Sequence, residues 1–485
     1  MKRKLIYLFA LVFTPLVGCD TFNELSDAKE VAPIAVNVDL DIAVENLASV
    51  KGLTVKFDNY DEDLHYTKEV SGESVSMDGI LPGIYTVSVS GTAIDLENNE
   101  YYVNGNAVNA PLFEDGVGLD IKIKGLKVSP LVFKEIYYCG SRLPTGTTYF
   151  RDQFYEIYNN SGDVQYLDGI CMGHLYPGTA TTTLPVWPES DGDNYAYAER
   201  VWKFPGNGTD YPLQPGESVV ISQFAANHQL EQYNPLSPVN GSSSEFEFNM
   251  NNANFPDQPA YDMVHVCYNG LAVMGTVPQY LTSVNGAAYV IFRVPEDETW
   301  DPVNDESLKA KDLNKPKSKN VYAKIPIKYI LDAVEAVHNE TKANAKRVPA
   351  VLDAGMTWVG NTYCSLSVVR KLSVDEEGNP IVREETGTYI YQDTNNSTDD
   401  FERGVEPQMR RNGAKMPSWN HTLQEYLKEQ NNEKTIYTIC KKRLVDGCML
   451  DWHGDSSPRL FTCCYGTIEN ETSVVPITEC SRYGV

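Results

Sequence analysis

Two short acidic loops carry the side chains of this chain that are best suited to hold a cation. One loop spans residues 189–194 (ESDGDN) and the other spans residues 393–399 (DTNNSTD). Alternating carboxylate and amide oxygens on a tight loop are the hard ligands that Ca²⁺ prefers. The candidate Ca²⁺ ligands are therefore Asp191 and Asp193 in the first loop and Asp393, Asn395 and Asp399 in the second.

Another explanation of both loops needs no metal. Neither loop matches the EF-hand pattern, in which a Glu occupies the twelfth position of the loop. Asn and Asp side chains also hydrogen-bond their own backbone in Asx turns. We therefore expect turn chemistry and no cofactor, with Ca²⁺ binding as the alternative.

Paired carboxylates could serve a glycosidase, which needs two carboxyl groups about 5–9.5 Å apart. Glu156 with Asp168 and Asp399 with Asp400 are such pairs, but a chain with 66 Asp and Glu residues produces pairs by chance. Other catalytic signatures are missing from the sequence, which contains no G-x-S-x-G, HExxH, Walker or G-x-G-x-x-G motif. We therefore assign no catalytic residue and do not expect an enzyme.

Glu156 lies in FYEIYNNSGDVQYLDG, residues 154–169, directly after two aromatic residues. Successive side chains of a strand point to opposite faces, so Phe154, Glu156 and Tyr158 share one face of the predicted strand. Residues 159–163 have the composition of a turn. We expect Glu156 to bond to the backbone or to a Tyr hydroxyl near a sheet edge, rather than to act in catalysis.

An aromatic-rich segment, residues 184–204, supplies the candidate ligand-binding surface. Its sequence is LPVWPESDGDNYAYAERVWKF, in a chain with 30 Tyr and 6 Trp. Exposed aromatic rings among polar groups are suited to stack on sugars or to contact another protein. The candidate ligand-binding residues are Trp187, Tyr195, Tyr197 and Trp202. The alternative is that these rings cover their own domain.

The first residues, MKRKLIYLFALVFTPLVGCD, predict an exported and lipid-anchored protein. Basic residues 2–4 precede an apolar stretch, residues 5–17, that is shorter than the ~20 residues of a membrane span. The following LVGC resembles a bacterial lipobox, so we expect a signal peptide at 1–18 and lipidation of Cys19. More than one acyl chain on Cys19 would give stable anchoring. The alternative is a chance Cys after an ordinary signal peptide.

Composition and net charge limit the classes of partner that this protein could bind. The chain has 485 residues and a net charge of -26, which argues against nucleic acid and against an anionic membrane face. Its length allows two to four domains. Ten cysteines are present, so an odd number remains once Cys19 carries lipid. An oxidising compartment permits disulfides, and the crowding of cysteines at the C-terminus indicates a separate Cys-rich tail.

Hydrophobic patterning predicts the architecture. Apolar and polar residues alternate at period two through residues 31–128, as in an antiparallel β-sandwich. Within residues 325–346, an amphipathic helix is expected, with its apolar face formed by Ile327, Ile330, Leu331, Val334 and Val337. The predicted fold class is mainly β, with two tandem β-sandwich domains, the second enlarged by long loops and one amphipathic helix, and a Cys-rich tail.

The domain boundaries follow from these changes in pattern. We expect a signal peptide at 1–18, a lipid anchor and acidic linker at 19–32, a first sandwich at 33–127, a second sandwich at 128–415 and a partly irregular tail at 416–485.

Several motifs resemble known domains. SMDGILPGIYTV, residues 76–87, is similar to the hairpin of transthyretin-like or carboxypeptidase-regulatory domains, which implies a spacer. The segment 154–169 is similar to the opening of lamin-tail-like domains, an immunoglobulin-type sandwich. LQPGESVVI at 213–221, SVVRK at 367–371 and DTNNSTDDF at 393–401 are similar to later segments of that domain. Insertions at 174–212, 226–262 and 296–362 depart from its pattern.

The whole layout resembles surface lipoproteins of Bacteroidetes-type bacteria. That resemblance implies a protein anchored in the outer membrane by Cys19 and facing the cell exterior, with the periplasmic face as the alternative. It also implies a non-catalytic binding protein that captures a glycan or other small ligand for an outer-membrane transporter. The alternatives are an adhesin or surface structural protein, and a glycan-directed hydrolase.

Overall fold

The computed structural model describes residues 31–432 except for positions 45, 98–99, 128, 182, 276–281, 343–344, 421–422 and 430. The chain divides into two compact units, residues 1–417 and 418–485. Of the helices in the described part, none is long and apolar enough to cross a membrane. The predicted signal peptide, Cys19 and the tail cysteines lie outside the described residues; these cysteines are Cys440, Cys448, Cys463, Cys464 and Cys480.

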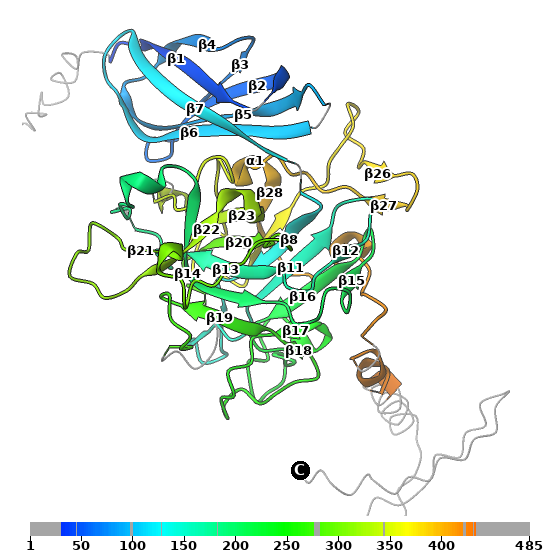
Figure 1. Cartoon of the computed structure of the whole chain (residues 1–485). Helices are drawn as coiled ribbons and strands as arrows, with labels where there is room; N and C mark the ends of the chain where they lie inside the picture. Colours follow the sequence, from blue (N-terminus) through cyan, green and yellow to red (C-terminus); the bar gives the residue numbers. More distant parts are fainter. Residues whose placement is uncertain are drawn as a thin grey trace, which may run out of the picture. The chain divides into compact units, whose positions relative to one another are not determined.

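The first seven strands form one sheet, in the order β3-β2-β5-β6-β7-β1-β4 (Figure 1). β1 runs parallel to β7 and antiparallel to β4. In β1 the side chains of Ile34, Val36, Val38 and Leu40 are buried while those between them are more exposed, as period-two alternation predicts. The strands are β1 (Ile34–Ala43), β2 (Leu47–Asn59), β3 (Leu64–Val70), β4 (Ser74–Ile80), β5 (Gly83–Asp95), β6 (Glu100–Leu112) and β7 (Val117–Lys127).

A second seven-stranded sheet has the order β18-β17-β16-β11-β8-β25-β28. Its inner strands β8, β11, β16 and β25 are buried along their whole length. The strands are β8 (Leu131–Tyr137), β11 (Phe154–Asn159), β16 (Ser218–Ser222), β17 (Phe246–Glu247), β18 (Tyr261–Asp262), β25 (Ser367–Arg370) and β28 (Phe401–Val405).

The third large sheet has the order β21-β22-β14-β13-β20-β23-β24, with β19 also paired to β14. Its strands lie between residues 171 and 358. They are β13 (Cys171–Leu175), β14 (Tyr195–Lys203), β19 (Val264–Tyr268), β20 (Ala288–Phe292), β21 (Lys309–Ala310), β22 (Tyr322–Pro326), β23 (Ile330–Val337) and β24 (Thr357–Trp358).

Short elements complete the described part. Three two-stranded ladders pair β9 (Ser141–Arg142) with β10 (Thr148–Tyr149), β12 (Gln165–Tyr166) with β15 (Pro212–Leu213), and β26 (Val382–Arg383) with β27 (Thr388–Tyr389). The helical turns are η2 (Glu189–Asp191), η3 (Gly241–Ser243), η4 (Glu306–Leu308), η5 (Ile327–Tyr329), η6 (Glu340–Lys342), α1 (Ser397–Asp400) and η7 (Arg411–Gly413). In the second unit, residues 423–429 are helical.

The second and third sheets pack through aromatic side chains. Phe133 on β8 and Tyr155 on β11 belong to one sheet, and Tyr289 on β20 belongs to the other. The Tyr289 ring centre lies 6.3 Å from that of Phe133 and 5.4 Å from that of Tyr155. All three side chains are fully buried. Interdigitated side chains between two sheets are typical of a sandwich, so the prediction of a mainly β, sandwich-type fold is confirmed.

The prediction of an amphipathic helix within residues 325–346 is wrong, because Ile330–Val337 form strand β23. β23 lies between β20 and β24, and nearly all of its side chains are buried. A strand buried on both faces shows no alternation. Its acidic residues Asp332 and Glu335 pair with Arg370 and Arg347 inside the protein. In the sequence, the spacing of these acidic residues resembles the polar face of an amphipathic helix, although both carboxylates are buried in the structure.

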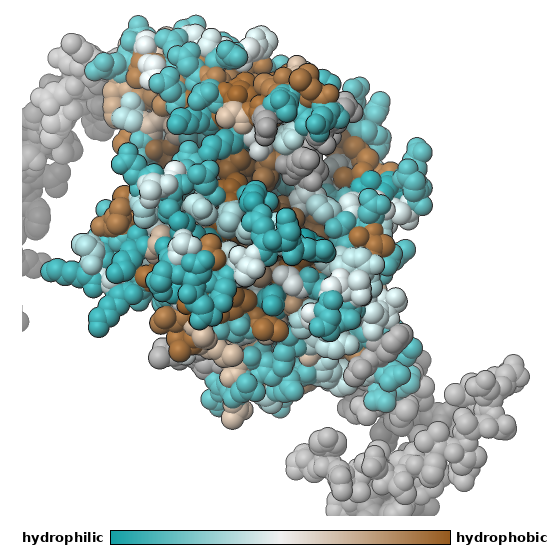
Figure 2. All heavy atoms as spheres, viewed as in Figure 1, coloured by the Kyte–Doolittle hydropathy of each residue, from teal (hydrophilic) through white to brown (hydrophobic). Residues whose placement is uncertain are grey.

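The face of the first unit that is seen in Figure 2 is largely polar. Figure 2 shows hydrophilic side chains over much of the visible face, with hydrophobic residues in smaller areas between them. A net charge of -26 contributes to this polarity, because excess charge of one sign keeps a protein soluble.

Candidate functional site

Glu156 forms a buried ion pair. Its Oε1 lies 3.0 Å from Lys134 Nζ, and both side chains are fully buried. Ser218 Oγ donates to the same oxygen at 2.6 Å, and the backbone N–H of Arg410 donates to both carboxylate oxygens at 3.2 and 3.1 Å. Burial lowers the pKa of Lys134, and the Glu156 charge opposes that shift. The carboxylate is surrounded by donors, which indicates a structural role.

A β-bulge in β8 brings Lys134 to this carboxylate. Along the β11–β8 ladder, Glu156 lies opposite Glu135 and Ile157 lies opposite Phe133, so Lys134 is the extra residue. A bulge turns the extra side chain out of the regular alternation. The expected backbone bond to Glu156 is confirmed, but its expected place near a sheet edge is wrong, since β11 lies between β8 and β16.

Arg370 ties together a second buried network. Its guanidinium lies 2.6 Å from Asp332, 3.0 Å from Asp393 and 3.7 Å from Asp400, and all four side chains are almost completely buried. Its Nε also donates to Phe133 O at 2.7 Å. Burial raises the pKa of Asp332 and of Asp400. Arg370 thereby connects β8, β23 and β25 with the loop that begins at Asp393.

The predicted Ca²⁺ ligands of residues 393–399 have protein partners. Asp393 pairs with Arg370, and Asp399 pairs with Lys56 of the first sheet. Asn395 adopts a left-handed backbone with φ 52°, a conformation that Asn tolerates better than most residues. These contacts account for the composition of the loop without a cation.

Turn chemistry is visible in the same loop. The Asn396 side chain caps α1 and accepts from Thr398 N at 3.1 Å. The Asp400 carboxylate accepts from Thr394 N at 2.9 Å and from Asn396 N at 3.2 Å. The Asn396–Thr398 bond is an Asx turn of the kind expected from the sequence, and Asp400 adds carboxylate bonds to the backbone of the same loop.

The ligands proposed in residues 189–194 do not share one centre. Asp191 Oδ1 lies 2.6 Å from Lys324 Nζ, and its Oδ2 accepts from Tyr197 OH at 3.1 Å. The Asp193 side chain is 68% exposed and lies 3.4 Å from Lys124 Nζ. The two carboxylates therefore bond to different cationic side chains.

One acidic trio does gather in the described part of the chain, at residues that the sequence did not single out. Carboxylate oxygens of Glu247, Asp257 and Asp262 lie within 4.8 Å of one another. Glu247 is buried, and burial raises its pKa to about 7. Its two oxygens accept from the backbone N–H groups of Ala225 at 2.9 Å and Gln258 at 3.0 Å. This trio has the spacing that a divalent cation would require.

Three of the four candidate ligand-binding aromatics lie in one cluster. Trp187 stacks on Tyr197 with ring centres 3.8 Å apart, and Lys324 Nζ lies 4.3 Å from the ring centre of Tyr195. Tyr197 is only 6% exposed. Trp187 and Tyr197 stack on each other and Tyr195 packs against Lys324, which matches the alternative that these rings cover their own domain.

Trp202 does not belong to this cluster, and its expected place on the surface is wrong. It is fully buried, with its ring centre 5.2 Å from that of Phe248 and 4.9 Å from that of His265. Trp202 and Tyr197 both lie on β14, but five residues of strand separate them, which is roughly 16 Å at about 3.3 Å per residue. Sequence proximity therefore did not place them together.

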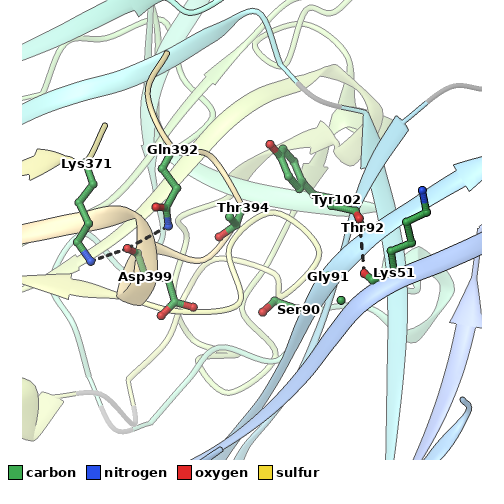
Figure 3. Close-up of a pocket in the computed structure, with 10 residues that line it drawn as sticks. Lys51, Ser90, Gly91, Thr92, Tyr102, Lys371, Gln392, Thr394 and Asp399 are labelled. Atoms are coloured by element: carbon green, nitrogen blue, oxygen red, sulfur yellow. Dashed lines mark hydrogen bonds between the residues drawn. The ribbon is translucent and has the colours of Figure 1, made fainter. Parts of the chain in front are cut away.

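A pocket of about 550 Å³ lies within the first unit, between the first sheet and the segment that follows β25 (Figure 3). In Figure 3, Lys371, Gln392 and Asp399 lie on one side of it and Lys51 and Thr92 lie on the other. The residues that line it are Lys51, Gly52, Ser90, Gly91, Thr92 and Tyr102 of the first sheet, and Lys371, Gln392, Thr394 and Asp399 of the segment after β25.

Hydrogen bonds shape the second wall of the pocket. Lys371 Nζ and Gln392 Nε2 donate to the backbone oxygen of Asp399 at 2.7 and 3.3 Å. Asn104 Nδ2 of the first sheet donates to Thr394 O at 3.2 Å. These bonds hold the loop of residues 392–399 in one conformation beside the first sheet.

The charge of the pocket differs from that of the whole protein. Asp399 supplies the carboxylate of its lining and is paired with Lys56. Lys51 is exposed, and its Nζ has no hydrogen bond or ion pair among the described residues. Lys371 Nζ bonds to a backbone oxygen. A locally cationic, hydroxyl-rich pocket is therefore present in an acidic protein.

Sequence reasoning missed most of this pocket. Of its lining residues it had selected Asp399, and for a different role. The other residues are common polar types at unremarkable spacings in two segments far apart in the chain. A local motif cannot reveal a site whose two walls meet only in the folded protein.

Comparisons with known proteins place the chain in a family. A family profile described as a protein of unknown function, DUF4876, matches residues 214–408. The crystal structure of a DUF4876 family protein from Bacteroides thetaiotaomicron VPI-5482 is 75% identical over 80% of this chain and 100% of that chain, with a TM-score of 0.61. No curated protein matches.

A second solved structure is much less similar. It is that of an adhesin candidate from Bacteroides ovatus ATCC 8483, with 12% identity over 59% of this chain and 85% of that chain. Its TM-score of 0.16 is too low to support an inference about fold or function. The identity with the Bacteroides thetaiotaomicron protein is decisive: the chain belongs to the DUF4876 family.

Proposed function

We propose that this protein is a lipid-anchored protein of the outer membrane that captures a small ligand at the cell surface and catalyses no reaction. The lipobox-like LVGC that ends at Cys19 supports the anchor. In this proposal, a transthyretin-like first sandwich is the spacer and also supplies one wall of the ligand site. A lamin-tail-like second sandwich supplies the other wall, and an outer-membrane transporter then receives the ligand.

The pocket of Figure 3 is the observation that carries the proposal. Its volume of about 550 Å³ falls in the range of small-molecule sites, about 300–1,000 Å³. Ser90 and Thr92 offer hydroxyl groups for hydrogen bonds, Gln392 offers its amide oxygen, and Tyr102 offers an aromatic ring. This combination suits a sugar or a similar polyhydroxylated molecule.

The charge of the lining favours an acidic ligand. Lys51 and Lys371 bring two ammonium groups to the pocket, while the Asp399 charge is offset by Lys56. A cationic pocket in a protein of net charge -26 concentrates anions locally. We therefore expect an oligosaccharide that carries carboxylate groups to bind better than a neutral one.

The same lining argues against hydrolysis. A glycosidase needs two carboxyl groups that flank the scissile bond, whereas the pocket lining contains one, in an ion pair with Lys56. The residues of the first carboxylate pair considered from the sequence bond to other protein groups. Glu156 bonds to Lys134, and Asp168 accepts three backbone N–H groups of the 208–211 turn.

The test is titration calorimetry of the full mature chain with uronic acid-containing and neutral oligosaccharides of equal length. Lys51→Glu and Tyr102→Ala are each expected to weaken binding of the acidic sugar about tenfold or more. Lys122→Glu is the matched control, since Lys122 is an exposed lysine of the same sheet outside the lining. Equal losses in all three variants, or no binding to any sugar, would contradict the proposal.

The anchor and the partner need separate measurements. Cys19→Ala is expected to release the protein from the outer membrane, and protease treatment of whole cells should degrade the wild type if it faces outward. A pull-down from outer membranes should recover a transporter. Attachment to host or neighbouring cells without a soluble ligand would indicate an adhesin instead, and cleavage of the sugar panel would indicate a hydrolase.

A further inference from the structure

Two thiols that stand 225 positions apart in the chain lie next to each other in the fold. Cys139 Sγ and Cys364 Sγ are 3.5 Å apart. Cys139 is buried and follows β8, and Cys364 is partly exposed and precedes β25. β8 and β25 are neighbours in the second sheet, so the two cysteines stand at the same end of adjacent strands.

The backbone on both sides of Cys364 is tied to the backbone at Cys139. Tyr363 N donates to Cys139 O at 2.7 Å, and Ser365 N donates to Gly140 O at 3.1 Å. Tyr363 and Ser365 both adopt left-handed backbone conformations, with φ 54° and 62°. Residues with a Cβ rarely adopt this region, and two such residues around one cysteine fix the direction of its side chain.

We propose that Cys139 and Cys364 form a disulfide bond that clamps residues 359–366 to the end of β8 in the exported protein. The two sulfur atoms are already in contact, and a disulfide requires them to approach to about 2.05 Å. The flanking backbone bonds hold the two chain segments together, which favours this approach.

The oxidant is a protein disulfide of an envelope thiol–disulfide oxidoreductase. The Cys364 thiolate attacks one sulfur of that disulfide, forms a mixed disulfide and releases the other sulfur as a thiolate. The Cys139 thiolate then attacks Cys364 Sγ and releases the second oxidant thiolate. The two protein thiols have lost two electrons and two protons, and the oxidant disulfide has become a dithiol.

The environment of each thiol suggests this order of attack. A hydrogen bond from Cys139 lowers the pKa of the Cys364 thiol to about 6, and that same bond together with burial raises the pKa of Cys139. The more exposed and more acidic thiol is the one that an oxidant reaches first. Of the other described cysteines, Cys171 and Cys267 are both buried in the core of the third sheet.

Peptide mapping of the full mature chain tests the bond directly. The protein is exported to an oxidising compartment, denatured without reductant in the presence of N-ethylmaleimide, digested and examined by mass spectrometry. The expected result is a Cys139 peptide linked to a Cys364 peptide. Alkylation of both thiols, or a link from either one to a tail cysteine, would overturn the proposal.

Thermal unfolding tests whether the bond clamps the fold. Reductant is expected to lower the melting temperature by about 5–10 °C, because the bond closes a long loop. The Cys139→Ala/Cys364→Ala variant should melt at one temperature with and without reductant. Cys267→Ala is the control and should keep the response. A double variant that responds to reductant as the wild type does would show that the stabilising bond lies elsewhere.

Discussion

Lys134 Nζ lies 3.0 Å from Glu156 Oε1, with both side chains fully buried between the strands of the second sheet and the segment that contains Arg410. Charges in the interior lose their hydration, and only close partners offset that loss. The pair is therefore a point where a single substitution should have a large effect on stability.

We expect Lys134→Met to lower the free energy of unfolding by about 3–5 kcal/mol, because it leaves the Glu156 carboxylate buried without its cation. Urea denaturation followed by tryptophan fluorescence measures this loss. The control is Lys328→Met at the exposed Lys328–Glu298 pair, where the lysine side chain is 67% exposed and an effect below about 1 kcal/mol is expected. Similar losses in the two variants would contradict the structural role of the buried pair.

Arg370→Met should be among the most damaging substitutions, with a loss of about 3–5 kcal/mol or more, because Asp332, Asp393 and Asp400 all depend on this guanidinium. Arg370→Lys should recover only part of that loss, since an ammonium cannot reproduce the planar fork. Urea denaturation midpoints test this order, with the wild type most stable, Arg370→Lys intermediate and Arg370→Met least stable. Arg142→Met, at an exposed arginine, should leave the midpoint nearly unchanged.

Acid should destabilise the protein in part through His228. Tyr149 OH and Phe224 O bond to its two ring nitrogens at 2.7 and 2.9 Å, and burial lowers its pKa to about 4, below the ~6.5 of an unfolded chain. Because the unfolded chain binds more protons between these values, this contribution to stability is lost as the pH falls through that window. From pH 7 to pH 5 the loss should be about 2 kcal/mol.

The variant His228→Gln isolates this effect. The difference in unfolding free energy between wild type and variant should shrink by about 2 kcal/mol from pH 7 to pH 5. His65→Gln is the control. The hydrogen bond that the His65 ring donates to the Asp58 carboxylate raises the pKa of His65, so its contribution is present at low pH and lost as the pH rises. A wild type and a His228→Gln variant with parallel pH profiles would disprove the role of His228.

Chelation should leave the melting temperature unchanged in calcium-free buffer. The carboxylates of Asp191, Asp393 and Asp399 already pair with lysine or arginine side chains. A fall in melting temperature after overnight chelation, reversed by Ca²⁺, would contradict this prediction. The variant Asp257→Asn/Asp262→Asn would then show whether the acidic trio is the site, because a response that persists in it must come from the loops.

The local hydrophobic pattern was sufficient to predict the strands of the first sheet. Alternation at period two placed Val36 and Val38 in its core, since a strand such as β1 has one buried face and the pattern reports that face directly. The same reasoning failed for β23, where both faces are buried and the acidic residues Asp332 and Glu335 find cations inside the protein. The predicted lipid anchor at Cys19 lies outside the described residues and stays a prediction.

The sequence by itself determined the mainly β class, the alternating strands of the first sheet and the turn chemistry of residues 393–400, because these depend on residues close together in the chain. The tertiary structure decided which charges meet. The bulge at Lys134, the burial of Trp202, the contact of Cys139 with Cys364 and the pocket between Lys51 and Lys371 all join segments far apart in sequence. Short-range spacing carries no record of such contacts, since they arise only when separate strands pack together.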